Sequence, residues 1–72
     1  MKYTQCELII KYIDEFGSIT RWEAMRELGI ANFGARQTDL KNKHNIKLVG
    51  KWEAGYSRYG TPVKWKRYTY DN

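Results

Sequence analysis

The sequence is poor in the residues that build disulfides and metal sites, with one cysteine and one histidine among its 72 residues. A single cysteine cannot form an internal disulfide, which indicates a reducing compartment. Cys6 and His44 are too few for a zinc site and lie far apart in the sequence. The sequence also has no glycine-rich phosphate loop, no metal-ligand spacing and no nucleophile motif beside His44. We therefore expect no catalytic residue, no metal and no cofactor, and we expect that the protein is not an enzyme.

Long apolar runs are absent as well. No run approaches the ~20 residues that a helix needs to cross a bilayer, so we expect no membrane partner. Residues 1–5 are not typical of a signal peptide, because a capped helix begins at once. Repeats, linkers and low-complexity tracts are also missing. These absences predict a single domain over residues 1–72 and a cytoplasmic protein.

The residues that are present predict a folded, basic domain. Hydrophobic residues make up 42% of the chain and aromatic residues 15%, which is too apolar and too aromatic for disorder. The formal net charge of +5 is unevenly distributed. Residues 1–28 contain four basic and five acidic side chains, whereas residues 29–72 contain nine basic and three acidic ones. The second part of the chain either meets a phosphate backbone or simply presents a basic, solvated surface.

Two capping boxes predict where the first two helices begin. One pairs Thr4 with Glu7, and the other pairs Thr20 with the glutamate three residues later. They predict helices over about residues 5–16 and 21–28, each ended by a glycine that tolerates a left-handed backbone. The expected core-facing residues of these helices are Cys6, Ile9, Ile10, Ile13, Phe16, Trp22, Met25 and Leu28. On this stripe Cys6 is a small core residue rather than a nucleophile.

The third helix follows a tight turn and is rich in long polar side chains. Asn32 is a suitable N-cap for a helix over about residues 33–43. Arg36 and Gln37 stand on the same face as the apolar residues of this helix. Either Arg36 lays its stem along the edge of the core, or this helix presents more polar surface than the other two. Arg36 is also spaced to pair with Asp39.

The C-terminal part of the chain predicts a β-hairpin. Residues 46–52 alternate between apolar and polar side chains enough to form a strand. Residues 53–60 indicate a long loop, and residues 61–70 form the returning strand. Val63 and Trp65 share one face of that strand whereas Tyr68 and Tyr70 share the other, which is compatible with a bulge. Residues 18–20 either form a short strand or simply tie two helices together. We expect the three tryptophans to lie in the core or on a sheet face.

These elements follow one another as helix, short strand, helix, turn, helix, strand, wing and strand. That order predicts an α+β fold, a winged helix-turn-helix with three helices, a short strand and a C-terminal β-hairpin wing. Short segments spread over nearly the whole chain carry a resemblance: Phe16-Gly17-Ser18-Ile19-Thr20, Glu23-Ala24, Leu28-Gly29-Ile30, Ala35-Arg36, Asp39-Leu40-Lys41, Asn45-Ile46, Arg58-Tyr59-Gly60 and Lys66-Arg67-Tyr68. In this order they resemble the small phage-type winged helix-turn-helix proteins of Gram-positive phages and prophages. The resemblance implies a DNA-binding fold.

The third helix has about the right length to lie in a major groove, with its early side chains at base edges. The candidate DNA-binding residues of this recognition helix are Asn32, Arg36, Gln37, Thr38 and Lys41. The candidates on the wing, which would meet the backbone or the minor groove, are Lys51, Arg58, Tyr59 and Lys64. Tyr59 alternatively packs against the hairpin. We predict that the protein binds double-stranded DNA as a small regulator or architectural protein of a phage or mobile element, in the host cytoplasm at the nucleoid.

Two other partners stay open at this point. Winged helices are reused to bind proteins, so the alternative is an interaction module that binds and modulates a host protein. Such binding would survive salt, whereas DNA binding falls steeply with it. RNA is the third partner considered, although the sequence suggests no exposed aromatic platform for it. Because no dedicated dimerisation helix is visible, we expect a monomer or a weak homodimer.

Overall fold

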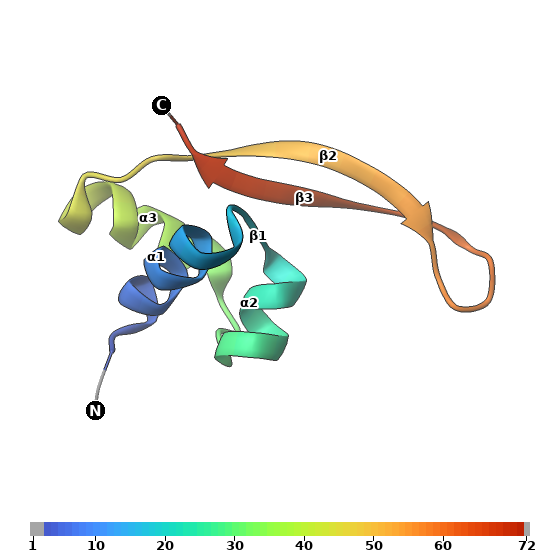
Figure 1. Cartoon of the computed structure of the whole chain (residues 1–72), viewed down its shortest axis with the longest axis horizontal. Coiled ribbons are helices and arrows are strands. Elements are labelled where there is room, and N and C mark those ends of the chain that lie inside the picture. The colour runs from blue at the N-terminus through green and yellow to red at the C-terminus, as the bar shows by residue number, and fades with distance from the viewer. Residues whose placement is uncertain (1–2, 72) are drawn as a thin grey trace.

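The computed structural model describes residues 3–71, so the first two residues of the N-terminal segment lie outside it. Within this range the helices are α1 (Gln5–Phe16), α2 (Arg21–Leu28) and α3 (Phe33–His44). The strands are β1 (Ile19–Thr20), β2 (Leu48–Tyr56) and β3 (Pro62–Tyr70). Figure 1 shows the helices on one side of the sheet, and the β2–β3 hairpin continuing past them to a tip beyond α2. The element order confirms the predicted α+β winged helix-turn-helix fold.

Both predicted capping boxes are formed. The Glu7 N–H donates to Thr4 Oγ1 at 3.1 Å, and the Thr4 N–H donates to Glu7 Oε1 at 2.8 Å. At the start of α2, the Glu23 N–H donates to Thr20 Oγ1 at 3.0 Å, and the Thr20 N–H donates to Glu23 Oε1 at 2.9 Å. These bonds satisfy amides that have no partner inside the helix, and the bounds of α1 and α2 agree with the prediction.

The turn between α2 and α3 places the third helix. Gly29 ends α2 with a left-handed φ of 70°, which explains a glycine at this position. The next residue, Ile30, is fully buried and donates its N–H to the carbonyl of Ala24 at 3.0 Å. Asn32 is the N-cap of α3, as predicted, because its side-chain oxygen accepts the N–H of Ala35 at 3.1 Å. A buried anchor and a cap therefore fix both ends of the turn.

The sheet is antiparallel with the strand order β1-β3-β2. From Leu48↔Tyr70 to Tyr56↔Pro62, every residue of β2 has one partner in β3, so the ladder between these residues has no bulge. The predicted loop over residues 53–60 was too long, since 53–56 continue β2 and the turn is confined to 57–61. Gly55 belongs to the strand because its missing side chain leaves room for Trp65, whose ring would lie 2.9 Å from an added Cβ.

The core lies where the three helices meet the end of the sheet nearest to them. Its buried apolar residues are Cys6, Ile9, Ile13, Ile19, Ala24, Ile30, Phe33 and Leu40. Phe33 is nearly inaccessible and packs against Tyr68 of β3, with 5.1 Å between ring centroids. Cys6 is buried, as predicted, and burial raises the pKa of its thiol. A thiol with a raised pKa is a poor nucleophile, which agrees with a packing role.

The prediction that Trp22 and Met25 face the core is wrong. Trp22 is 58% exposed and Met25 is exposed as well. Leu28 packs against the core as predicted, together with Ala24, which stands four residues before it on the same side of the helix. Phe16, the last residue of α1, is also exposed rather than core-facing and lies against Tyr12. Helical spacing alone thus placed Leu28 correctly in the short helix α2 but selected Trp22 and Met25 in place of Ala24.

The last residue of β3 fastens the hairpin to α1. The Tyr70 hydroxyl donates to Asp14 Oδ1 at 2.8 Å and lies 3.2 Å from the carbonyl oxygen of Ile10. Burial and the hydrogen bond to Asp14 raise the pKa of Tyr70 to about 12. The phenol therefore stays protonated and keeps donating at neutral pH. The end of the sheet cannot move away from α1 without breaking this contact.

Candidate nucleic-acid interface

The side of α3 that faces away from the core carries polar side chains. Phe33 and Leu40 are buried on the inner side of the helix, whereas Thr38, Lys41 and Asn42 are exposed. Thr38 and Lys41 are two of the predicted recognition residues, and the structure brings them onto one exposed side. The sequence analysis missed Asn42, although it stands four residues after Thr38 and so shares its face. This side offers hydroxyl, ammonium and amide groups to a partner.

The structure does not place Arg36 with these exposed residues. Its Nη1 donates to Gln5 Oε1 of α1 at 3.0 Å, and its Nη2 lies 3.2 Å from Asp39 Oδ2, the predicted pair. Its Nε is buried and has no hydrogen-bond partner among the described residues. The guanidinium thus lies at the edge between α3 and α1. This agrees with the interpretation that Arg36 lays its stem along the edge of the core. Gln37 is half-buried, so it too is less accessible than Thr38.

The tip of the wing is a tight turn held by Ser57. The Ser57 N–H donates to the carbonyl of Thr61 at 2.8 Å, and the Ser57 Oγ accepts the N–H groups of Tyr59 and Thr61. Gly60 has a φ of 81°, the left-handed conformation that this turn requires. Tyr59 is 88% exposed, so the alternative that it packs against the hairpin is wrong. Arg58 is also exposed, and both side chains lie at the outermost point of the wing.

The two predicted wing lysines lie on opposite faces of the hairpin. Lys51 pairs with Arg67 in the ladder, and Lys64 pairs with Ala54. Successive side chains of a strand point to alternate faces, and 51 and 54 differ by an odd number. Both lysines are exposed. The wing therefore carries positive charge on both of its faces.

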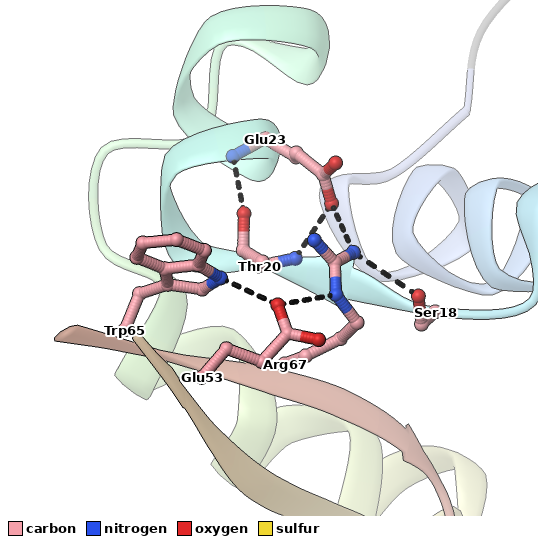
Figure 2. Close-up of polar contacts among 6 residues, drawn as sticks. All are labelled: Ser18, Thr20, Glu23, Glu53, Trp65 and Arg67. Carbon is pink, nitrogen blue, oxygen red and sulfur yellow. Dashed lines mark hydrogen bonds and ion pairs between the residues drawn. The ribbon is translucent and has the colours of Figure 1, made fainter. Parts of the chain in front are cut away.

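A polar network centred on Arg67 fixes the wing relative to the helices (Figure 2). The Arg67 Nε donates to Glu53 Oε1 of β2 at 3.0 Å. The Arg67 Nη1 donates to Ser18 Oγ at 3.2 Å and to Glu23 Oε1 of α2 at 3.3 Å. Trp65 adds a fourth bond, since its Nε1 donates to Glu53 Oε1 at 2.7 Å. One arginine thus joins both wing strands to the segment that starts α2.

The charged forms of Glu53 and Arg67 stabilise each other in this network. Hydrogen bonds from Arg67 and Trp65 hold the pKa of Glu53 below its usual value. The bond to Glu53 in turn raises the pKa of Arg67, and Glu23 contributes further. Glu23 also belongs to the capping box of α2. One carboxylate therefore both caps this helix and accepts a hydrogen bond from Arg67 of the wing. The angle between α2 and the wing is therefore specified by side chains of both.

All three carboxylates of the basic part of the chain are engaged. The pairs are Asp39–Arg36, Glu53–Arg67 and Asp71–Lys47, at 3.2, 3.0 and 3.8 Å. They use three of the nine basic side chains of residues 29–72. The six others, which make no ion pair within the described part of the chain, are Lys41, Lys43, Lys51, Arg58, Lys64 and Lys66. The excess positive charge thus lies on α3 and the wing, where a phosphate backbone can reach it.

An exposed aromatic surface lies between α2 and the wing, so the expectation of no aromatic platform is wrong. Trp22 of α2 and Trp52 of β2 are both exposed, and Trp52 is 68% accessible. Together with Met25 and the half-buried Trp65, they line an open groove of about 550 Å³. The sequence signal that could have found this surface is the position of Trp22, on the side of α2 opposite Ala24.

Among residues 3–71, no group of three or more histidine, cysteine, aspartate and glutamate side chains is arranged to hold a metal ion. Over the same residues, no helix has the length and apolar character needed to span a bilayer.

Comparison with known protein families agrees with this geometry. The profile of the winged helix-turn-helix domain matches residues 4–60. The match covers α1, β1, α2, α3, β2 and most of the wing tip, and it ends before β3 begins. No curated protein and no solved structure gives a significant match. Membership of such a family points in general to DNA as the partner. The chain belongs to the winged helix-turn-helix domain family.

Proposed function

We propose that this protein binds double-stranded DNA, with α3 in the major groove and the basic wing on the backbone. The observation that carries the proposal is the distribution of charge. Six cations on α3 and the wing have no carboxylate partner in the described chain, whereas the three carboxylates of the same part are all paired. Lysine and arginine that neutralise phosphates release counterions, which supplies most of the non-specific affinity for DNA.

The exposed side of α3 suits a major groove. The helix has twelve residues, so it is about 18 Å long at ~1.5 Å per residue. Gly34 and Ala35 near its start are small and allow the backbone to approach the bases. Thr38 and Asn42 offer groups that bond base edges, and Lys41 offers a charge for a phosphate. Arg36 is held by α1, so we propose that it orients α3 rather than reads a base.

The wing suits a minor groove. Its lysines lie on opposite faces, so a hairpin inserted between the two phosphate strands brings Lys51 to one strand and Lys64 to the other. Arg58 and Tyr59 are exposed in the turn at the tip and extend this contact. Cations placed in a minor groove are attracted by its negative potential.

The biological role that we propose is that of a small regulator or architectural protein of a phage or mobile element. It is supported by the order of short segments in which the chain resembles phage-type winged helix-turn-helix proteins. Such a role places the protein at the nucleoid in the host cytoplasm. We propose a monomer or a weak homodimer. A dimer would bind two half-sites about one helical turn apart, which footprinting on a selected site would detect.

The test compares two lysine variants on a labelled duplex of mixed sequence by fluorescence anisotropy. Lys41→Ala removes a charge from the exposed side of α3 and is expected to weaken binding and lower the salt slope by about one. Lys11→Ala removes the same charge from an exposed position on α1, which is neither on α3 nor on the wing, and should leave affinity unchanged. Equal effects of the two variants would contradict the proposed orientation. Failure of the native protein to bind the duplex would favour the alternative, a host protein partner whose binding survives salt.

A further inference from the structure

Of the residues that line the groove between α2 and the wing, only Lys64 belongs to the proposed duplex contact. The groove has a volume of about 550 Å³ and lies between the N-terminal half of α2 and the middle of the hairpin. Its aromatic and apolar side chains include Trp22, Met25 and Trp52. A pocket of this size is within the range of about 300–1,000 Å³ that holds small ligands. A contiguous group of large apolar side chains that stays exposed to water on a small domain is typical of an interaction site.

The two exposed indoles belong to different elements that the fold holds in place. Trp22 stands in the first turn of α2, which the capping box and Arg67 fix. Trp52 stands in β2, directly opposite Lys66 in the ladder. The Lys66 Nζ lies 5.2 Å from the centre of the Trp52 ring, so the ammonium and the indole contact each other. Lys66 occupies one face of the Trp52 ring, but Trp22 is 58% exposed and Trp52 68%, so both walls of the groove offer aromatic surface to a planar ligand.

The charge of the groove is of one sign. Its charged lining residues are Arg21, Lys64 and Lys66, and no carboxylate is among the described residues that line it. The occupant must therefore carry negative charge as well as flat apolar faces. Unpaired nucleotides have both properties, because each base has a face that stacks on an aromatic ring and each link carries a phosphate. In a duplex these faces are hidden in the base stack, so the groove suits a single strand.

We propose that this groove binds single-stranded DNA, with bases stacked on Trp22 and Trp52 and phosphates at Arg21, Lys64 and Lys66. The choice of DNA rests on the proposed function, since a strand leaving a duplex at the wing enters the groove beside Lys64. The protein then recognises a place where a duplex opens, with the duplex on α3 and the wing and the unpaired strand between α2 and the wing.

The experiment measures the affinity of the full chain for a labelled oligothymidylate of about 12 nucleotides, a length within known site sizes. Trp22→Ala and Trp52→Ala should each weaken this binding by roughly fivefold to a hundredfold, the loss of one stacked base. Both side chains are exposed, so both variants are expected to fold, which circular dichroism checks. Phe16→Ala, an equally exposed aromatic residue outside the groove, is the matched control and should bind as the native chain does.

The same variants are measured on the duplex, so that the two proposals fail separately. Duplex affinity should stay within about twofold for Trp22→Ala and Trp52→Ala, since neither indole is in the proposed duplex contact. Native protein that binds the duplex but not the oligothymidylate overturns the groove site and leaves the proposed function. Binding of the oligothymidylate alone supports the groove and removes the duplex proposal.

Three further results would overturn the assignment. The first is unchanged oligothymidylate affinity in both tryptophan variants. The second is binding of oligouridylate that is tighter than that of oligothymidylate, which would show that RNA is the preferred ligand of the groove. The third is a concentration-dependent dimer of the native chain that Trp52→Ala abolishes, which would give the groove to a second copy. Quenching of tryptophan fluorescence as the native chain is titrated with oligothymidylate is the result that supports stacking.

Discussion

The two ends of the β2–β3 hairpin are built from the same strands but have different surroundings. Near the helices, Leu48, Tyr68 and Tyr70 pack against the buried core. Towards the tip, Trp52 and Tyr56 are exposed although the ladder continues unbroken through both of them. Figure 1 shows why, since the distal half of the hairpin extends past the helices.

This difference separates side chains that hold the fold from side chains that are free to bind. At the near end, burial of large rings stabilises the domain. At the far end, the backbone ladder and the Arg67 network keep the strands together, while the aromatic rings gain little from folding. A sheet end that keeps its shape without a core beneath it can present rings and cations to a partner.

The largest effect on stability is expected at the buried end. Phe33→Ala removes a nearly inaccessible ring that contacts Tyr68, and it should lower the free energy of unfolding by about 3–5 kcal/mol. Trp52→Ala removes a larger ring from the exposed end and should change it by less than about 0.5 kcal/mol. Urea denaturation followed by circular dichroism measures both. Comparable losses in the two variants would contradict the distinction between the two ends.

A second comparison uses two glycines of β2. A Cβ at Gly50 would lie 2.9 Å from the Tyr68 ring, which Phe33 holds in place, so Gly50→Ala should cost about 1–3 kcal/mol. A Cβ at Gly55 would meet Trp65 at the same distance, but that ring borders the open groove and can shift towards it at the expense of its bond to Glu53. Gly55→Ala should therefore cost less, as measured by thermal denaturation. A greater loss at Gly55 would show that the far end is packed as rigidly as the near end.

The third prediction concerns acid. Arg67 and Trp65 hold the pKa of Glu53 below 4.5, its reference value. The stability from this lowered pKa is therefore fully present above about pH 4.5 and is lost as pH falls through the folded pKa. Glu53→Gln should flatten the fall in unfolding free energy as the pH drops below about 4.5, whereas Glu15→Gln, on α1 outside the network, should not. Parallel curves for native protein and Glu53→Gln would show that the bonds to Glu53 do not contribute to this pH dependence of stability.

The smallest effects are expected from single cations of the wing. Lys51→Ala and Lys64→Ala should each weaken duplex binding evenly across sequences and lower the salt slope by about one. Because the two lysines lie on opposite faces, the double variant should lower the slope by about two if the wing lies between two phosphate strands. A change in only one of the single variants would place a single face of the wing on the backbone. Anisotropy titrations at several salt concentrations distinguish these results.

The sequence predicts the helices better than the hairpin, and the reason is the range of the interactions. A threonine and a glutamate three residues apart begin α1 and α2, so both starts can be seen locally. The extent of β2 depends on partners in β3 that are 22 residues away at its start, Leu48↔Tyr70, and still 6 residues away at its end, Tyr56↔Pro62. Gly55 was taken as part of a loop because nothing near it in sequence shows the Trp65 ring that needs its space.

The same limit applies to the candidate site. Thr38 and Lys41 could be placed on the exposed side of α3 because the position of Phe33 defines the inner side. The interaction of Arg36 with Gln5 could not be predicted, since 31 residues separate them. In α2, the larger Trp22 suggested the core face, whereas the small Ala24 is the residue that packs there. Size and hydrophobicity mislead where a short helix has two apolar stripes.

The most direct test of duplex binding is the salt dependence of the native protein on a generic labelled duplex, from about 50 to 300 mM. We predict a steep fall in affinity, with a slope of log K against log salt that reaches about −5 if all six unpaired cations meet phosphates. Affinity that is absent at the lowest salt, or that hardly changes over this range, would contradict the account.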